Sequence, residues 1–333
     1  MPAGPTQPTP SDNQRVTRLA PSPTGALHLG NALTFLTNWA LARRLGWRIV
    51  LRIEDLDGPR IKQGSDGQAI DLLRWLGIDW DGGPTYQSAD LAPYRQALES
   101  LAQRGLIYPS DATRSQIEAA LSAPHEGDHE LRYPGINRPA GGGFGLDADT
   151  PPLLEDDDTA WRLVVPDEAV CFVDQVLGER RVNVQRQVGD FVVATKAGLP
   201  AYQLAVVVDD ARQGVTDVVR GSDLVDSTAR QLLLYRHLVI GPVPAYYHLP
   251  LVYGVDGLRL AKRHGDTRLV RYREQGIPAQ RVVGLLAYWA GLVDRPEPMD
   301  ALAFARLLEP DRLPSGSVTF TPEHEQWLQA GSY

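Results

Sequence analysis

Cysteine, lysine and long apolar runs are all scarce in this sequence. The single cysteine, Cys171, excludes an internal disulfide and a zinc site built from cysteines. No stretch approaches the roughly 20 apolar residues that a membrane-spanning helix needs, and the N-terminus lacks the basic and apolar pattern of a signal peptide. We therefore expect a soluble, cytoplasmic protein with no membrane contact and no redox chemistry.

Positive charge is scarce as well. The 333 residues carry a formal net charge of -8, which is the wrong sign for a protein that coats nucleic acid through a general basic field. Any contact with nucleic acid must be local. Of the 33 lysines and arginines, only Lys62, Lys196 and Lys262 are lysines, so a lysine at a special position carries information.

The pattern of apolar segments predicts an α/β fold. Residues 16–20 and 47–53 are strand-like and flank a helical segment at 29–45, which predicts a βαβ unit with parallel strands. Apolar runs at 204–208 and 215–219 predict strands with which the doubly wound sheet resumes. We expect a disordered leader (1–14), the first half of a nucleotide-binding domain (15–108), an inserted subdomain with a flexible tip (109–189), the second half (190–265) and a helical C-terminal segment (266–333).

The run from Arg18 to Asn31 (RLAPSPTGALHLGN) lies between the first strand and the first helix. Backbone N–H groups at a helix start bind anions, and Gly30 lets a nucleotide approach closely. His28 and Asn31 can both hydrogen-bond phosphate oxygens. For His28 alone, a purely local role at the start of the helix is the alternative.

A second run, Gly257 to Arg263 (GLRLAKR), follows a predicted strand far down the chain. A flexible ammonium such as that of Lys262 can follow the moving charge when pyrophosphate leaves. The alternative is a solvated basic loop.

Residues between these runs suit a dicarboxylic amino acid, whose ammonium needs an acceptor and whose side chain needs a bidentate cation. Glu54 follows the second strand, and Arg220 follows the run at 215–219. Tyr202 precedes the run at 204–208. The structural alternative for Glu54 is an ion pair with Arg52 or Arg60, and that for Arg220 is an ion pair with Asp223. For Tyr202 the alternative is a tyrosine of the core.

The first run resembles the first signature of class I aminoacyl-tRNA synthetases, in the His-x-Gly-Asn form of the glutamyl branch, and the second resembles that family's Lys-Met-Ser-Lys-Ser loop, with Lys262 at its second lysine. The resemblance covers about residues 15–264. It implies a Rossmann-like doubly wound parallel sheet split by an insertion, and activation of L-glutamate by ATP with Mg²⁺. It further implies ATP-binding residues His28, Gly30, Asn31, Lys262 and Arg263, with His28, Asn31 and Lys262 catalytic, and glutamate-binding residues Arg18, Ser22, Glu54, Tyr202 and Arg220.

Only about 70 residues follow the lysine loop, which is short for an anticodon-binding domain. This outline resembles the branch of the family that activates glutamate without tRNA and attaches it to queuosine in the anticodon of tRNA-Asp. Two alternatives stay open: a truncated glutamyl-tRNA synthetase that charges a tRNA 3′ end, and a non-catalytic paralogue. We expect a monomer whose macromolecular partner is the anticodon loop of tRNA-Asp, with contacts from Arg180, Arg181, Arg186, Arg268, Arg271 or Arg273.

One feature departs from that branch. Its members commonly hold zinc with Cys-x-Cys and Tyr-x-x-x-Cys, where the matching positions here are Ser110, Ala112, Tyr133 and Asn137. His125 and His129 alone would not close a tetrahedral site. We therefore expect no zinc and no other bound structural metal.

Overall fold

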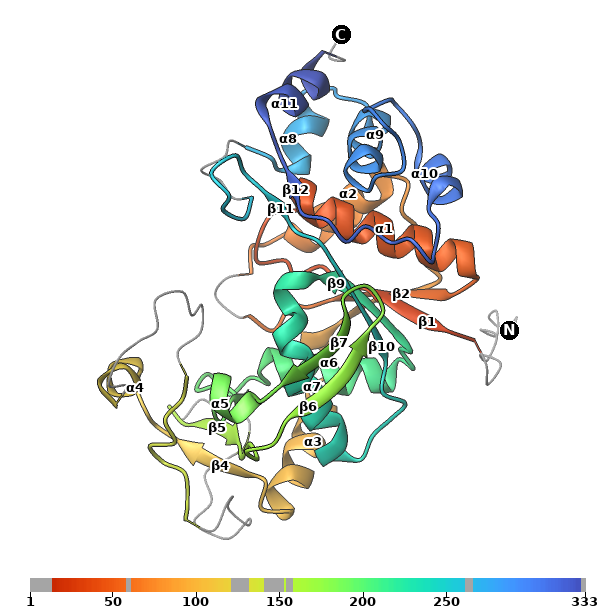
Figure 1. The fold of residues 1–333 in the computed structure, drawn as a ribbon. Helices are drawn as coiled ribbons and strands as arrows, with labels where there is room; N and C mark the ends of the chain where they lie inside the picture. Colours follow the sequence, from red (N-terminus) through yellow and green to blue (C-terminus); the bar gives the residue numbers. More distant parts are fainter. Residues whose placement is uncertain are drawn as a thin grey trace.

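The computed structural model describes residues 14–57, 61–120, 132–140, 153, 158–260 and 266–330. Its central sheet has seven strands in the order β3-β2-β1-β9-β10-β6-β7 (Figure 1). Neighbouring strands run parallel except for the antiparallel pair β6 and β7 at one edge. The strands are β1 (Val16–Leu19), β2 (Arg48–Ile53), β3 (Gly82–Tyr86), β6 (Val170–Asp174), β7 (Gly178–Val182), β9 (Asp217–Gly221) and β10 (Ala245–Leu249).

Helices cover both faces of this sheet (Figure 1). One face carries α1 (Leu29–Leu45), α2 (Ser65–Trp75), α9 (Ala279–Trp289) and α10 (Ala301–Leu307), and the other carries α3 (Ala92–Gln103), α6 (Tyr202–Arg212) and α7 (Val225–Leu238). Leu51 and neighbouring residues of β2 alternate between the two faces, as the period of two along a strand requires. The α/β fold predicted from the sequence is confirmed.

The predicted βαβ unit is also confirmed, since β1 and β2 pair in parallel on either side of α1. Helix α1 ends at Gly46, whose φ of 69° lies in the left-handed region. Glycine adopts this conformation without the steric cost that a side chain brings, so the chain can turn back into β2 here.

The expectation of a strand at residues 204–208 is wrong. These residues belong to helix α6, which is buried on all sides from Gln203 to Asp210. A short, continuous apolar run has no period that distinguishes a buried strand from a buried helix. Packing of α6 against α3 and α7 decides the conformation, despite three consecutive valines with a preference for strands.

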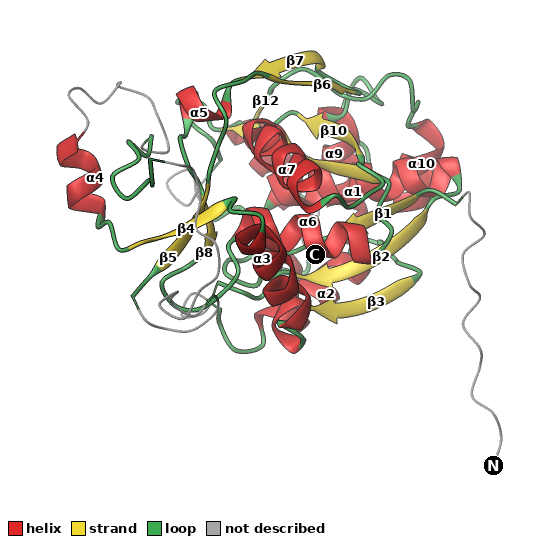
Figure 2. Ribbon diagram, turned by 90° about the horizontal axis from the view of Figure 1, so that it is seen from below, coloured by secondary structure: helices red, strands yellow, loops and turns green. Residues whose placement is uncertain are grey.

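A second sheet of three antiparallel strands stands beside the central one (Figure 2). It contains β4 (Ile107–Ser110), β5 (Ala160–Leu163) and β8 (Val192–Ala194), accompanied by α4 (Arg114–Ala120) and α5 (Val184–Gln187). Its strands come from both sides of the boundary expected at residue 189. Conversely, β6 and β7 lie within the expected insertion 109–189 but pair with β10 of the central sheet.

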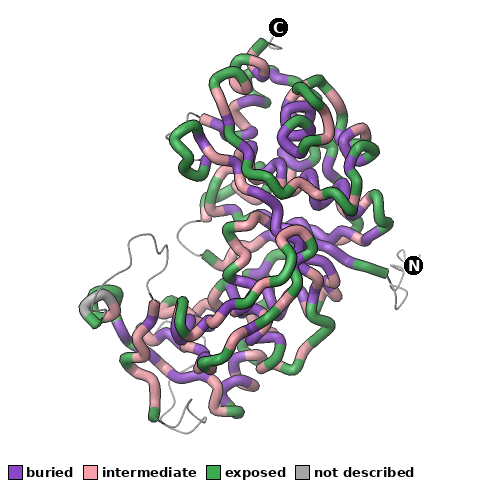
Figure 3. The backbone as a smooth tube through the Cα atoms, viewed as in Figure 1, coloured by how far each residue is buried: buried purple, intermediate pink, exposed green. Residues whose placement is uncertain are grey.

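The C-terminal helices share one apolar core with α1. Leu286 of α9 and Phe304 of α10 are fully buried in the same cluster as Leu33 and Leu36 of α1. Figure 3 shows how buried and exposed residues alternate along the chain in this part of the molecule. The remaining elements are α8 (Leu269–Glu274), α11 (Pro322–Gln329), the short parallel strands β11 (Val252–Tyr253) and β12 (Val318–Thr319), and the 3₁₀ turns η2 (Gln87–Ala89) and η3 (Ser222–Leu224). No helix among the described residues is long and apolar enough to cross a membrane.

Candidate active site

Three buried arginines lie near the carboxyl ends of neighbouring central strands. They are Arg18 on β1, Arg52 on β2 and Arg220 on β9. All three reach polar side chains of α6 or α7, which places them on the face of the sheet opposite α1. Doubly wound sheets bind their ligands at the carboxyl ends of the strands.

Acidic residues of α6 pair with two of these arginines. Nη1 of Arg52 donates to Oδ1 of Asp210 at 2.7 Å, and Nε of Arg18 lies 3.5 Å from the same oxygen. Asp209 lies 3.9 Å from Nε of Arg52, and burial raises the pKa of its carboxyl although Arg52 opposes the shift. The charges under α6 therefore compensate one another, as buried charges must.

Arg220 is held by neutral acceptors instead. Its Nε donates to Nε2 of His248 (3.0 Å), its Nη1 to Oε1 of Gln231 (2.9 Å), and its Nη2 to Oγ1 of Thr228 (2.8 Å) and to the carbonyl oxygen of Leu224 (3.2 Å). These bonds use four of the five guanidinium N–H donors and leave one on Nη1. Within the described residues, Arg220 has no carboxylate partner, so its charge is available to an anionic ligand.

The alternative ion pair of Arg220 with Asp223 is not present. Asp223, in η3, instead pairs with Arg259, whose Nη1 lies 2.5 Å from Oδ2 of Asp223. Because one N–H of Arg220 remains, a ligand carboxylate would receive one hydrogen bond from it in this arrangement rather than a bidentate pair.

Glu54 follows β2 and has a side chain that is only 13% exposed. Its Oε1 accepts a hydrogen bond from Nη2 of Arg52 at 3.1 Å, so the ion pair considered from the sequence is present. Burial raises the pKa of the Glu54 carboxyl, although Arg52 and Arg18 act in the opposite direction. One hydrogen bond leaves acceptor capacity on this carboxylate for a ligand ammonium.

His28 is the N-cap residue of α1. Its Nδ1 accepts hydrogen bonds from the backbone N–H groups of Gly30 and Asn31, at 3.1 and 3.4 Å, and Oδ1 of Asn31 accepts from the backbone N–H of His28. Since Nδ1 accepts, the ring proton is assigned to Nε2, which can donate to an anion. Burial, helped by Arg259, lowers the pKa of His28 to about 4, so the imidazole is neutral at neutral pH.

A cavity of about 170 Å³ is lined both by residues predicted to bind ATP and by residues predicted to bind glutamate. Its lining contains one end of α1 and the charged ends of the strands. The predicted residues in that lining are Arg18, His28, Gly30, Asn31, Glu54, Tyr202 and Arg220.

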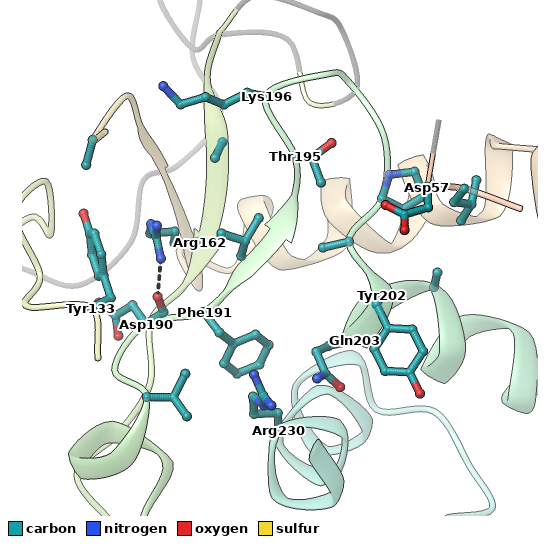
Figure 4. Close-up of a pocket in the computed structure, with 18 of the residues that line it drawn as sticks. Asp57, Tyr133, Arg162, Asp190, Phe191, Thr195, Lys196, Tyr202, Gln203 and Arg230 are labelled. Atoms are coloured by element: carbon teal, nitrogen blue, oxygen red, sulfur yellow. Dashed lines mark hydrogen bonds between the residues drawn. The ribbon is translucent and has the colours of Figure 1, made fainter. Parts of the chain in front are cut away.

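A larger cavity of about 1220 Å³ shares Glu54 and Tyr202 with the first and also contains Ser22. It extends to the second sheet, where Arg162 and Lys196 line it. Figure 4 shows Tyr202 at one end of this cavity and Lys196 toward the other. Tyr202 is the first residue of α6 and is 39% exposed, so it is not the core tyrosine that the sequence left possible.

Lys262 and Arg263 lie outside the described residues. The preceding part of the loop is described up to Leu260, and Arg259 bridges to Tyr253 of β11. Arg259 also lines the smaller cavity. The loop therefore leaves the sheet beside the site.

Comparison with known proteins identifies the family. Residues 14–290 match the model of the catalytic domain of class I tRNA synthetases (E and Q). A Glutamyl-Q tRNA(Asp) synthetase of Symbiobacterium thermophilum is 45% identical over 328 residues, which cover 95% of this chain and 98% of that protein. Another from Rhodopirellula baltica is 48% identical, covering 83% of this chain and 85% of that protein.

The chain belongs to the glutamyl-Q tRNA(Asp) synthetase family. It is a ligase of the class I aminoacyl-tRNA synthetase type. Its fold matches the crystal structure of a glutamate tRNA ligase from Elizabethkingia meningosepticum in complex with its amino acid. That match has a TM-score of 0.74 and 24% identity, and covers 95% of this chain and 69% of that one.

The positions at which this branch commonly holds zinc form a hydrogen-bonded cluster in this member. Ser110 donates to Oδ1 of Asn137 (2.8 Å) and lies 3.1 Å from the hydroxyl of Tyr133, while Asn137 also bonds to Asp111 (3.2 Å). Ala112 contributes only a methyl group. This set does not fit zinc, which takes thiolate, imidazole or carboxylate ligands. No cluster of potential metal ligands occurs elsewhere in the described residues.

Sequence reasoning missed several polar residues of this synthetase site. Asp209 and Asp210 directly follow the run 204–208, and neither they nor Gln231 and His248 were considered as site residues. The available signal was polar residues within apolar segments: His248 interrupts the apolar strand β10, and two acids end the apolar run of α6. Buried polar groups need partners, so such residues point to one another.

Proposed function

We propose that this chain activates L-glutamate with ATP in the absence of tRNA, and then transfers the glutamate to queuosine in the anticodon of tRNA-Asp. The observation that carries the first half is the shared cavity: a helix start suited to phosphate and an arginine without a counter-charge face the same hollow. The family of the chain and its similarity to Glutamyl-Q tRNA(Asp) synthetases support the second half.

In the activation step, an oxygen of the α-carboxylate of glutamate attacks the α-phosphorus of ATP. The new bond gives glutamyl-adenylate, and the bond to pyrophosphate breaks. We assign the side-chain carboxylate to Arg220 and the ammonium to Glu54, with Arg18, Ser22 and Tyr202 completing the glutamate pocket. These assignments place opposite charges together.

On the phosphate side, Nε2–H of His28 and the side chain of Asn31 donate to phosphate oxygens, with Gly30 leaving room for the nucleotide. Lys262 and Arg263 would supply positive charge from the adjoining loop. Mg²⁺ is proposed to arrive bound to the triphosphate, because phosphoryl transfer develops more charge than these side chains neutralise.

The acceptor then has to reach the activated carboxyl carbon. The larger cavity opens next to Glu54 and Tyr202 and is roomy enough for a nucleobase outside a base stack. Attack by the acceptor on this carbon releases AMP. The proposal requires the cytoplasm, because ATP and tRNA are both found there. It requires no second subunit, because one chain contains both cavities.

Pyrophosphate exchange tests the activation step. We expect exchange of labelled pyrophosphate into ATP that depends on glutamate, needs Mg²⁺ and proceeds without RNA. Each of the other standard amino acids serves as a control. Exchange that appears only after tRNA is added would instead favour a truncated glutamyl-tRNA synthetase, and no exchange under any condition would favour a non-catalytic paralogue.

A further inference from the structure

A buried aspartate–histidine pair lies behind Arg220. His248 on β10 is the cross-strand neighbour of Arg220 on β9, and its Nε2 accepts from Nε of Arg220 at 3.0 Å. On its other side, Nδ1 of His248 lies 2.6 Å from Oδ2 of Asp174. Both side chains of the pair are fully buried, so solvent does not supply alternative partners.

The chemistry of arginine fixes the tautomer of His248. A guanidinium in a protein stays protonated and can only donate, so Nε2 of His248 must be the acceptor. The ring proton is then on Nδ1 and is donated to the Asp174 carboxylate. Burial lowers the pKa of His248, despite the adjacent Asp174, which agrees with a neutral ring.

Asp174 is itself held firmly. Its Oδ1 accepts from the backbone N–H groups of Val176 (3.0 Å) and Leu177 (2.8 Å), in the turn between β6 and β7. Although burial opposes it, hydrogen bonding from His248 and from this turn lowers the pKa of the Asp174 carboxyl. The hairpin β6–β7 at the edge of the sheet thus places a fixed carboxylate beside β10.

We propose that Asp174 and His248 are positioning residues that orient Arg220 toward the side-chain carboxylate of the amino-acid substrate, without giving Arg220 a counter-charge. This inference rests on the proposed function. A carboxylate bonded directly to Arg220 would hold the guanidinium equally well but would compete with the substrate. The neutral imidazole of His248 lies between Asp174 and Arg220, so it orients the guanidinium without neutralising it. The positive charge of Arg220 is left for the ligand, which favours glutamate over glutamine.

Asp174→Asn provides the sharpest test. The asparagine oxygen can still accept from the turn, but its NH₂ group now faces Nδ1 of His248. That contact favours the opposite tautomer, with a proton on Nε2 directed against Nε of Arg220. In glutamate-dependent pyrophosphate exchange, we expect the KM for glutamate to rise about tenfold or more, while the KM for ATP changes by less than about twofold.

Asp217→Asn is the matched control. Asp217 is a fully buried carboxylate on the same strand as Arg220, but it pairs with Arg15 at the opposite end of β9. This variant loses a buried ionic group as well, and its KM for glutamate should stay unchanged. In an Arg220→Ala background, Asp174→Asn should raise the KM no further, because the group it orients is gone.

His248 supplies a second, independent pair of variants. In His248→Gln the side-chain oxygen can accept from Arg220, so the KM for glutamate should stay within about threefold of the original, whereas His248→Ala should match Asp174→Asn. Equal KM values for the Gln and Ala variants, or parallel rises in both KM values for folded Asp174→Asn, would overturn the inference. Absence of glutamate-dependent exchange in the unaltered protein would instead contradict the proposed function.

Discussion

His28 caps α1 through one ring nitrogen, and in the proposed function its other ring nitrogen binds phosphate. Nδ1 caps α1, and Nε2 carries the proton that a phosphate oxygen can accept. The low pKa, about 4, keeps the ring from charging near neutral pH. In the proposed function, the ring is therefore a neutral hydrogen-bond donor to phosphate whose protonation does not change near neutral pH.

His28→Asn separates these two tasks. Asparagine is among the best N-cap residues, so we predict a free energy of unfolding within about 0.5 kcal/mol of the original protein. Turnover in pyrophosphate exchange at saturating ATP and glutamate should nevertheless fall by roughly tenfold or more, since the Nε2 donor is lost. His28→Ala should lose the cap too, at a cost of about 1 kcal/mol in denaturant unfolding. Unchanged turnover in His28→Asn would reduce His28 to a helix cap.

Glu54 leads to a prediction about pH. Because burial raises the pKa of its carboxyl, Glu54 becomes protonated at a higher pH than an exposed glutamate does. The protonated form offers no negative charge to an ammonium, so the KM for glutamate should rise as the pH falls through that pKa and stay level above it. Exchange measured from about pH 8 down to pH 5 tests this. Glu54→Gln should have a high KM that changes little with pH. A level KM for the unaltered protein over this range would contradict the assigned role.

Single residues were predictable where they are neighbours in the chain. The run from Arg18 to Asn31 could be interpreted as a unit, and the structure brings its Arg18, His28 and Asn31 to one cavity. Arg52 and Asp210 are far apart in sequence, and nothing local indicates that they pair. The tautomer of His28 also depends on backbone geometry that the sequence does not contain.

At the scale of secondary-structure elements, the sequence predicts units of consecutive elements better than it predicts which distant elements pair with one another. The βαβ unit was predictable because its strands and helix follow one another and alternate in period. The placement of β6 and β7 beside β10 was not, because it depends on a long-range pairing of Asp174 with Tyr246. Helix α6 was mistaken for a strand because its burial on all sides removes the helical period.

The cluster of Ser110, Tyr133 and Asn137 gives a prediction at the same scale. These hydrogen bonds join β4 of the second sheet to the segment 132–140. If they do so without metal, chelation should leave the unfolding temperature of the nucleotide-free protein unchanged. Asn137→Ala should cost about 1–2 kcal/mol in denaturant unfolding, because it leaves the Ser110 and Tyr133 hydroxyls with fewer partners in a buried setting. Metal analysis completes the test. One equivalent of tightly held zinc, whose removal lowers the unfolding temperature, would contradict it.

At the scale of the whole molecule, both faces of the central sheet serve the site. The face toward α1 is supported by α9 and α10, whose apolar side chains share its core and so hold the helix that carries His28. The opposite face carries Arg18, Arg52 and Arg220 together with their hydrogen-bond and ion-pair partners on α6 and α7. Acidic residues compensate Arg18 and Arg52, and the chain as a whole carries a net charge of -8, so the positive charge that a ligand would meet is local, at Arg220.

The central claim is that glutamate goes to the queuosine base of tRNA-Asp. A measurement that locates the attached amino acid tests it most directly: labelled glutamate and ATP are supplied with tRNA-Asp that contains queuosine, with tRNA-Asp that has guanosine at that position, and with tRNA-Glu. Each product is digested with a nuclease, and the labelled fragment is identified. The proposal predicts label only on the queuosine-containing anticodon fragment of tRNA-Asp. Label on the 3′-terminal adenosine of tRNA-Glu would contradict it.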